Sequence, residues 1–281
     1  MLLDMELSFY KIHLAFRDYI IVNSLTVELP SQEELRSFVR SICQRNSGVG
    51  ARGVLLLVSD REHSGGVRFF DYRGEERQPG PEALICLARY AFDYGLAHSG
   101  KIVLQSLSGP KELQCIDSSH FSICAGTPTS DGRNRIFADS GIDYQVHVKA
   151  GHRSLNYTPV HLDQSIAAVH VEGDANLLRR PLELDIDSSL PVAYTVLSKD
   201  EARLLSPLEE NVDIIQAAAG IGVAAVANGF CEKDIVVYLE GNNRLFFEWN
   251  ERSNTVYIAA DPRYAFSGYY TFGEDEYGPV D

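Results

Sequence analysis

Residues 217–230, AAAGIGVAAVANGF, are small and apolar almost throughout and end in an Asn-Gly pair. The run is long enough for a helix, and Asn or Gly often follows the last turn of one. A helix that is apolar on all sides has no face to present to water, so other elements must surround it. The segment therefore predicts a central helix buried among strands, and this requirement limits the folds open to the chain.

The rest of the sequence supplies those strands. Short runs rich in Val, Ile, Leu and Phe, bounded by Gly, Asp, Asn or Pro, predict strands in both halves of the chain. They cover residues 18–25, 54–59, 67–72, 101–107, 145–150, 166–172, 192–198, 234–240, 244–250 and 255–261. Two more helices are predicted, over 31–46 with Ser31 as N-cap and over 82–96 behind Pro81.

The predicted helices at 82–96 and 217–230 occupy corresponding places in the chain. Each follows a Gly-containing turn and precedes a Val-rich strand. This repetition predicts an α/β (α+β) protein with two similar halves, each a mixed sheet around a central helix. The halves would comprise residues 1–140 and 141–281. The segment 107–141 is the least regular and is predicted to link them.

Composition and charge reduce the number of function classes open to the chain. The 281 residues carry a formal charge of −14, and because phosphate binding needs a basic face, we expect no nucleic-acid partner. No apolar run has the length of a bilayer span or a secretion signal, so we expect a cytoplasmic protein with no membrane partner. The five cysteines are scattered without zinc-like spacing, so neither a disulfide framework nor a bound metal is expected.

Five segments, in order, match the motifs of one known family. They are 9-FYKIHLAFRDYIIVN-23, 45-RNSGVGARGVLLLV-58, 68-RFFDYRGEERQPGPEALICLARYAFDYG-95 and the pair 217-AAAGIGVAAVANGF-230 with 240-EGNNRLFFEWNERSNTVYIAADPRYAFSG-268. The first is similar to Phe-x-Lys-Met-His-Gly-x-Gly-Asn-Asp-Phe and the second to Arg-His-x-Gly-Ile-Gly-Ala-Asp-Gly-Leu-Leu-Leu-Val. On these segments the chain resembles the diaminopimelate epimerases over most of its length, with a poorly matched stretch at about 110–165.

The resemblance implies a fold of two α/β halves that face each other across a cleft. It also implies a chemistry that uses no pyridoxal phosphate or other cofactor. In the family, two cysteines at the starts of the two central helices act as thiolate base and thiol acid on opposite faces of an α-carbon. Helix N-termini suit that role because they lower the pKa of a thiol and bind a carboxylate through their N–H groups.

The sequence departs from the family at these catalytic positions. The first catalytic cysteine falls on Gly80, or on Pro79 or Pro81 if the gap moves by one residue, and the second falls on Ala219. The family's early Asn-Asp reads Arg17-Asp18, the Asn of its Phe-Asn-Ala-Asp segment reads Asp71, and Arg52 replaces an Asp. Its Glu-Arg before the second helix reads Glu210-Asn211. We therefore do not expect the two-thiol epimerisation of diaminopimelate.

Several residues remain candidates for a site at the two helix starts. Glu82 lies in the first predicted turn beside Gly80 and resembles the single proton-shuttling carboxylate of the phenazine-biosynthesis isomerases; it could equally do no more than offset the helix dipole. Arg17 and Arg52 could bind an acidic ligand or could pair with Asp71 and Glu82. The predicted substrate-binding set is Arg17, Asp71, Gly80, Glu210, Ala219, Gly220, Ile221 and Gly222.

The glycines of the second predicted helix allow two interpretations. The N–H groups of Ala219, Gly220, Ile221 and Gly222 could hold a carboxylate, or the glycines could serve close packing alone. A buried core role is expected for Cys86, because it lies well inside the predicted helix that follows Pro81.

Two functions follow from these residues. The first is an altered isomerase of amino-acid metabolism that moves a proton on a small amino-acid-like or carboxylate-bearing molecule, with Glu82 or Asp71 as acid and base. The second is an epimerase homologue without catalysis, a pseudoenzyme, that binds a small acidic ligand or a protein partner. Either function is compatible with a homodimer.

Overall fold

The computed structural model describes residues 5–27, 29–96, 100–130, 145–150, 153–172, 182–184, 186, 189–209, 212–250 and 252–272. The chain forms two compact units, one of residues 1–121 with 261–281 and the other of residues 122–260. The predicted boundary at residues 140 and 141 lies outside the described residues. The cleft predicted between the halves stays a prediction.

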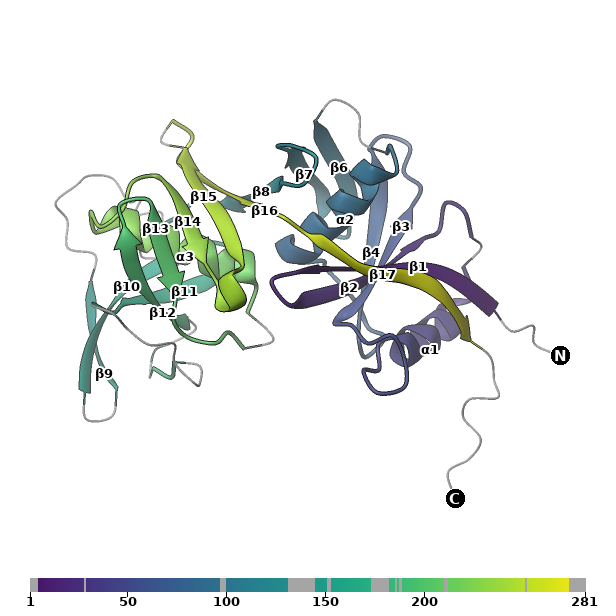
Figure 1. Cartoon of the computed structure of the whole chain (residues 1–281), viewed down its shortest axis with the longest axis horizontal. Coiled ribbons are helices and arrows are strands. Elements are labelled where there is room, and N and C mark those ends of the chain that lie inside the picture. The colour runs from purple at the N-terminus through teal and green to yellow at the C-terminus, as the bar shows by residue number, and fades with distance from the viewer. Residues whose placement is uncertain are drawn as a thin grey trace, which may run out of the picture. The chain divides into compact units, whose positions relative to one another are not determined.

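The first unit is a mixed sheet with helices on both faces (Figure 1). Its elements are β1 (Met5–Leu14), β2 (Arg17–Asn23), α1 (Gln32–Ile42), β3 (Gly53–Val58), β4 (Gly65–Asp71), β5 (Glu76–Arg77), α2 (Pro81–Asp93), β6 (Lys101–Ser106), β7 (Gly109–Cys115) and β17 (Arg263–Phe272). The last strand, β17, belongs to this unit because it pairs antiparallel with β1. The unit therefore combines residues from both ends of the chain, whereas a split at residue 140 would make it one continuous segment.

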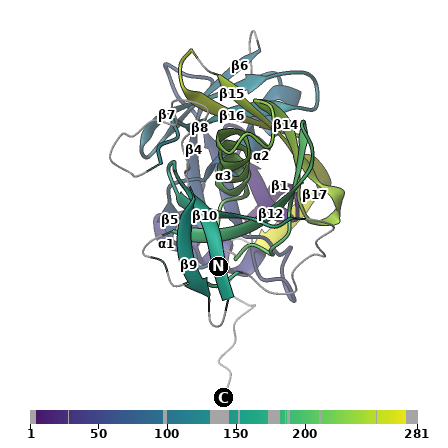
Figure 2. The same cartoon turned by 90° about the vertical axis from the view of Figure 1, so that its left-hand side faces the viewer.

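The second unit wraps its strands around one helix. Its elements are β8 (Phe121–Gly126), β9 (Val146–Ala150), β10 (Arg153–His161), β11 (Ser165–His170), β12 (Leu190–Ser198), β13 (Glu201–Leu204), α3 (Ile214–Ala227), β14 (Asp234–Tyr238), the 3-10 turn η1 (Glu240–Asn242), β15 (Arg244–Asn250) and β16 (Thr255–Ala260). Strands β10 to β16 all contact α3, which lies among them in Figure 2.

The two units repeat one strand pattern. In the first, β1, β2, β3, β4, β6 and β7 are neighbours whose pairings alternate between antiparallel and parallel. In the second, β10 to β15 repeat the same alternation in the same order. The second parallel pair of each unit is bridged by its central helix, α2 between β4 and β6 and α3 between β13 and β14, as parallel strands require a crossover. The predicted fold of two similar halves is confirmed.

Strand β2 of the first unit is buried on both faces. Ile20 and Val22 on β2 belong to an apolar cluster with Leu35, Phe38 and Val39 of α1. Successive side chains of a strand point to opposite faces, so Tyr19 and Ile21 lie on the other face, and Tyr19 contacts α2 there. Five consecutive residues of β2, from Asp18 to Val22, are therefore buried.

Helix starts follow local chemistry. α1 begins behind Ser31, whose hydroxyl accepts from the Glu34 N–H while the Glu34 carboxylate accepts from the Ser31 N–H. α2 begins at Pro81, as predicted, since a proline's missing N–H has no partner at that position anyway. Gly95 follows α2 at φ +70°, a conformation that favours glycine.

The segment 107–141 is not the irregular linker that the sequence predicts, because its described part contains β7 and β8. β7 begins with Gly109, Pro110, Lys111 and Glu112 and only Leu113 is buried, so the strand lacks the apolar run that marks the others. Its partner is β6, whose buried residues the sequence does reveal. Tertiary pairing, and not local pattern, makes this segment a strand.

Candidate active site at the start of helix α2

The first turn of α2 carries a buried carboxylate. Gly80 is the N-cap in extended conformation and has no side chain to cap the helix, and Pro81 is the first helical residue. Glu82 follows, with 3% of its surface exposed. A carboxylate is rarely buried so fully without partners, because removing the charge from water is costly.

Two side chains from neighbouring segments meet Glu82. The hydroxyl of Tyr19, on β2, donates a hydrogen bond to Glu82 Oε1. The Nε of Arg52 lies 3.8 Å from the same oxygen. Burial raises the pKa of Tyr19 well above its usual value, and the negative Glu82 adds to the rise. Tyr19 therefore stays protonated and donates to the carboxylate at any physiological pH.

The backbone fixes Arg52 in this place. Its N–H donates to Asp18 O at 3.0 Å, and its carbonyl oxygen accepts from the Tyr72 N–H at 3.0 Å. The residue is thus tied to β2 on one side and to the turn after β4 on the other. Its side chain is 23% exposed against 4% for Glu82, so Arg52 is the part of the pair nearer to solvent. Of the alternatives for this arginine, the structure shows the pairing with Glu82.

Asp71 has a local role. Its Oδ1 accepts from the N–H groups of Arg73 at 2.9 Å and Glu75 at 3.0 Å, and its Oδ2 lies 3.5 Å from Arg77 Nε. These contacts close the turn between β4 and β5, a usual task for an aspartate. The partner of Asp71 is therefore Arg77, not Arg17 or Arg52. Arg17 is half-buried at the start of β2, opposite Leu14 of β1.

A second charged group lies one residue from Tyr19. Asp18 accepts two hydrogen bonds from Arg45, at 2.8 and 3.0 Å, and lies 3.1 Å from Lys11 Nζ. Burial by itself raises the pKa of this carboxyl, but Arg45 and Lys11 outweigh burial and hold the pKa below its usual value. The group joins β1, β2 and the loop behind α1, and it stabilises the strand that presents Tyr19.

Sequence reasoning missed Tyr19 and the partners of Asp18. A signal for Tyr19 was available, because alternation along 18–25 places Tyr19 and Ile21 on one face of the strand. Tyr19 meets Glu82 only because α2 packs on that face of the strand. The strand pattern does not show which helix packs there. Arg45 is 27 residues from Asp18 and comes to it through the tertiary structure, whereas Lys11 reaches it from β1, the strand paired with β2.

The start of α3 differs from the prediction. The helix begins at Ile214 behind Asp213, three residues before the small apolar run. Asp213 Oδ1 accepts from the N–H groups of Ile215 and Gln216, and Gln164 Oε1 accepts from the Asp213 N–H at 3.2 Å. The Ala217 N–H donates to Asp213 O at 3.0 Å. Side chains and backbone of the protein itself thus occupy the amides at this helix start.

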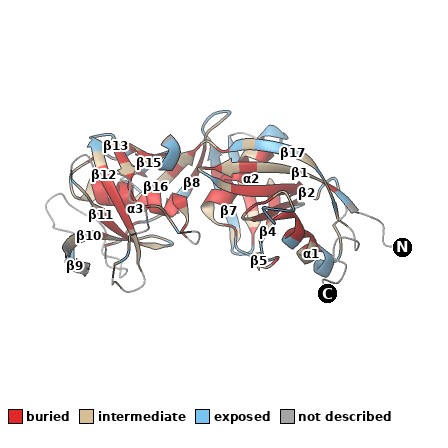
Figure 3. Cartoon of the chain, turned by 60° about the horizontal axis from the view of Figure 1, so that its bottom comes forward, coloured by how far each residue is buried: buried red, intermediate tan, exposed pale blue. Residues whose placement is uncertain are grey.

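Ala219, Gly220, Ile221 and Gly222 consequently lie inside α3, where every residue from Ile214 to Ala225 is buried (Figure 3). A Cβ on Gly220 would lie 2.7 Å from Ile166 and one on Gly222 would lie 2.3 Å from Phe247. The structure thus favours the packing interpretation of these glycines over an anion site. Glu210 lies outside the described residues.

The other candidates have structural places. Cys86 is fully buried on α2, and burial raises the pKa of its thiol well above the usual value, so it is no ready nucleophile. Within the part of the chain that the structure describes, no three His, Cys, Asp or Glu side chains gather as metal ligands would. No described helix has the length and apolar character of a membrane span.

Solved structures define the class of fold. A phenazine biosynthesis protein of the PhzF family from Bacillus anthracis superposes with a TM-score of 0.63 at 12% identity, over 95% of this chain and 100% of that one. Methylitaconate-delta-isomerase gives 0.61 at 11% identity, over 98% and 99%. A hydroxyproline epimerase from Agrobacterium vitis gives 0.59 at 9% identity, over 95% and 93%. The chain has the fold of these isomerases and epimerases.

Curated sequences give a nearer relation. Diaminopimelate epimerase from Parabacteroides distasonis is 26% identical over 94% of this chain and 98% of its own length. The enzyme from Heliobacterium modesticaldum is 24% identical over 93% and 99%. No protein-family model matches the chain. The chain is thus similar over nearly its whole length to diaminopimelate epimerases, and Gly80 and Ala219 stay the predicted equivalents of the two thiols.

Proposed function

We propose that the protein is an epimerase-like isomerase that moves a proton on a small carboxylate-bearing molecule with Glu82 as the proton carrier. The observation that carries the proposal is the buried Glu82 at the first turn of α2, held by the Tyr19 hydroxyl and Arg52. The names of the curated relatives and of the structural neighbours support the isomerase class.

Each of the three side chains has a part in this reaction. Arg52 is the most exposed of them and binds the ligand carboxylate, which competes with Glu82 for the guanidinium. Tyr19 orients the Glu82 carboxylate through Oε1, and in this reaction the second carboxylate oxygen accepts a proton from the carbon next to the ligand's carbonyl group. The same oxygen then returns the proton, so charge and atoms balance without any further reactant.

A single proton carrier restricts the outcome. Inversion of a stereocentre needs a base on one face of the carbon and an acid on the other. The position predicted for the second thiol is Ala219, which has no titratable group and is buried inside α3. One carboxylate can return the proton only to the face from which it came. A shift of the proton to a carbon two bonds away, on the same face, therefore fits this site better than racemisation.

Deuterium exchange tests the proposal. The protein is incubated in D2O with a panel of amino acids and small unsaturated acids, and incorporation at carbon is followed by NMR. We expect exchange in at least one member, and Glu82→Gln should slow it by about 10²–10⁴-fold, the usual contribution of an acid or base. Gln keeps the shape of Glu82 and an oxygen for Tyr19, so folding should be retained.

Glu33→Gln is the matched control, since Glu33 is an exposed acid on α1 of the same unit. It should exchange at the wild-type rate. Exchange that survives Glu82→Gln at full rate would overturn the assignment of Glu82. No exchange with any member of the panel would count against the isomerase.

The second candidate is a ligand-binding protein without turnover. The observation in its favour is the start of α3, whose amides are occupied by Asp213 and Gln164. In this case a small acid should raise the melting temperature without any deuterium incorporation, and Arg52→Gln should remove the rise. If neither effect were found, binding of a protein partner would become the favoured hypothesis.

A further inference from the structure

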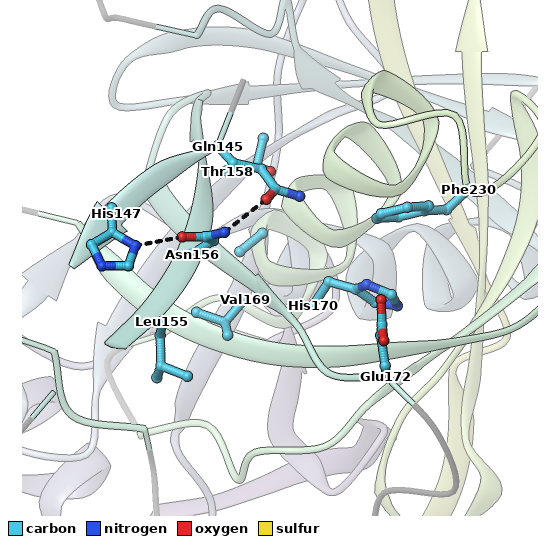
Figure 4. A pocket seen from close by; sticks show the side chains of 10 residues that line it. Gln145, His147, Leu155, Asn156, Thr158, Val169, His170, Glu172 and Phe230 are labelled. Carbon is cyan, nitrogen blue, oxygen red and sulfur yellow. Dashed lines mark hydrogen bonds between the residues drawn. The ribbon is translucent and has the colours of Figure 1, made fainter. Parts of the chain in front are cut away.

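A cavity of about 340 Å³ lies in the second unit, at the far end of α3 from Asp213 (Figure 4). Its walls are the β9–β10 hairpin, the end of β11 and Phe230, which follows the last turn of α3. Asn228, the C-cap of α3, donates to Thr158 in this wall at 2.9 Å. Small-molecule sites commonly measure roughly 300–1,000 Å³, so this one suits a small ligand.

One end of the cavity combines aromatic rings and a carboxylate. The rings of His170 and Phe230 lie 4.4 Å apart between centroids, and Tyr194 packs against His170 at 5.4 Å. Glu172 is exposed beside His170 (Figure 4). Burial lowers the pKa of His170 and outweighs the opposing effect of Glu172, so the imidazole is neutral near pH 7. Glu172 is then the charged group at this end.

The other walls supply an apolar path and an amide end. Leu155, Ala168 and Val169 line the middle. Beyond them His147 Nδ1 lies 2.8 Å from Asn156 Oδ1, and Asn156 donates to Gln145 Oε1 at 3.1 Å. This polar chain is internally bonded, so the two ends of the cavity differ in charge and in chemistry.

We propose that this cavity binds a small organic cation, an ammonium or guanidinium group carried on a short apolar stem. The cation lies beside Glu172, against the ring pair of His170 and Phe230, and the stem lies along Val169 and Leu155. Aromatic faces and carboxylates both attract cations.

The charges of the residues around the cavity disfavour an anionic ligand. None of the ten described residues that line the cavity is Lys or Arg, and the chain carries a formal charge of −14. The site is independent of the proposed function, because a helix of 14 residues, about 21 Å long, separates it from the start of α3, and Glu82 belongs to the other unit.

Isothermal titration with n-butylammonium chloride and n-butylguanidinium chloride tests this assignment, with sodium butyrate at equal ionic strength as the anionic counterpart. We expect a Kd on the order of 1 mM for at least one cation, as befits so small a ligand. Butyrate should give no measurable heat. Glu172→Gln should weaken the cation roughly tenfold, because it removes a charged hydrogen-bond acceptor.

Glu248→Gln is the matched control, since Glu248 is an exposed acid on β15 that does not line the cavity. Its Kd should stay within about twofold of the wild type, since an exposed charge outside the cavity is screened by salt. Phe230→Leu should weaken binding by about threefold, because it removes one ring of the His170–Phe230 pair. Glu82→Gln should bind the cation as the wild type does, which separates this site from the proposed active site.

Three results would overturn the proposal. Equal affinity in the Glu172→Gln and Glu248→Gln variants would show that the cations bind elsewhere. Butyrate binding as tightly as butylammonium would show that charge does not select the ligand. Absence of heat with both cations at 20 mM, about twenty times the expected Kd, would show that the cavity does not take them.

Discussion

The two central helices begin in different ways, although they occupy the same place in two units of one strand pattern. α2 starts at a Pro-Gly-Pro turn with no side chain on its N-cap, and it brings Glu82 to a buried position beside Tyr19 and Arg52. α3 starts behind Asp213, and its first amides are occupied by Asp213 and Gln164. The proposed function therefore uses a side chain of α2 as proton carrier, whereas the residues of α3 pack against the surrounding strands.

The largest expected difference between the helices is in thiol reactivity. In a Cys124→Ser background, which removes the exposed native thiol, Gly80→Cys should react readily with iodoacetamide, because Gly80 is half-buried at a helix start. Ala219→Cys should react on the order of 10²-fold more slowly, since that site opens only with the helix. Comparable rates, read by mass spectrometry, would show that position 219 inside α3 is as accessible as position 80 at the start of α2.

The glycines of α3 should resist enlargement. Gly222→Ala should lower the free energy of unfolding by about 1–3 kcal/mol in urea titrations, because the new Cβ meets the ring of Phe247. Gly268→Ala on β17 is the control, since its Cβ would lie at an ordinary 3.4 Å from Phe9. A stable Gly222→Ala protein would reopen the interpretation of these glycines as an anion site.

The Asp213 cap of α3 should contribute about as much to the free energy of unfolding as other side-chain caps do. Asp213→Ala should destabilise the protein by about 1 kcal/mol in the same titrations, because the Ile215 and Gln216 amides lose their acceptor. Asp213→Asn keeps a capping oxygen and should come within about 0.5 kcal/mol of the wild type. If Asp213→Ala were neutral, the amides would have other partners and the contrast with α2 would weaken.

The smallest effect is expected at the start of α2. Gly80 has extended backbone angles that any residue adopts, so Gly80→Ser can add the missing cap. It should stabilise the protein by a few tenths of a kcal/mol, the usual difference between Ser and Gly at an N-cap. A loss of stability, measured by thermal unfolding, would show that a side chain at this position collides with the group around Glu82.

Much of the fold follows from local pattern. The apolar run at 217–230 required a helix surrounded by strands, and the structure has α3 in contact with β10 to β16. The β-branched runs predicted strands because their side chains pack on a pleated surface. Strand β7 was not predicted from the sequence. It is a strand because it pairs with β6, and its composition alone does not indicate one.

The candidate site was only partly visible in the sequence. Pro81 and Glu82 were placed correctly at a helix start because proline at the first helical position is a local signal. The partners of Glu82 were not fixed by any local rule: Tyr19 is 63 residues away from it in the chain. The start of α3 was misplaced since Asp213 and the apolar residues after it extend the helix beyond the small-residue run.

The sequence by itself determined the two-unit plan, the buried central helices and the absence of thiols at Gly80 and Ala219. Those features depend on side-chain size, periodicity and residue identity, which can be read along the chain. Only the tertiary structure decided that Arg52 pairs with Glu82, that Asp71 closes a turn, and that Ala219 lies inside α3. These facts depend on which strands become neighbours, and burial then leaves each buried charge with the partner that the fold brings to it.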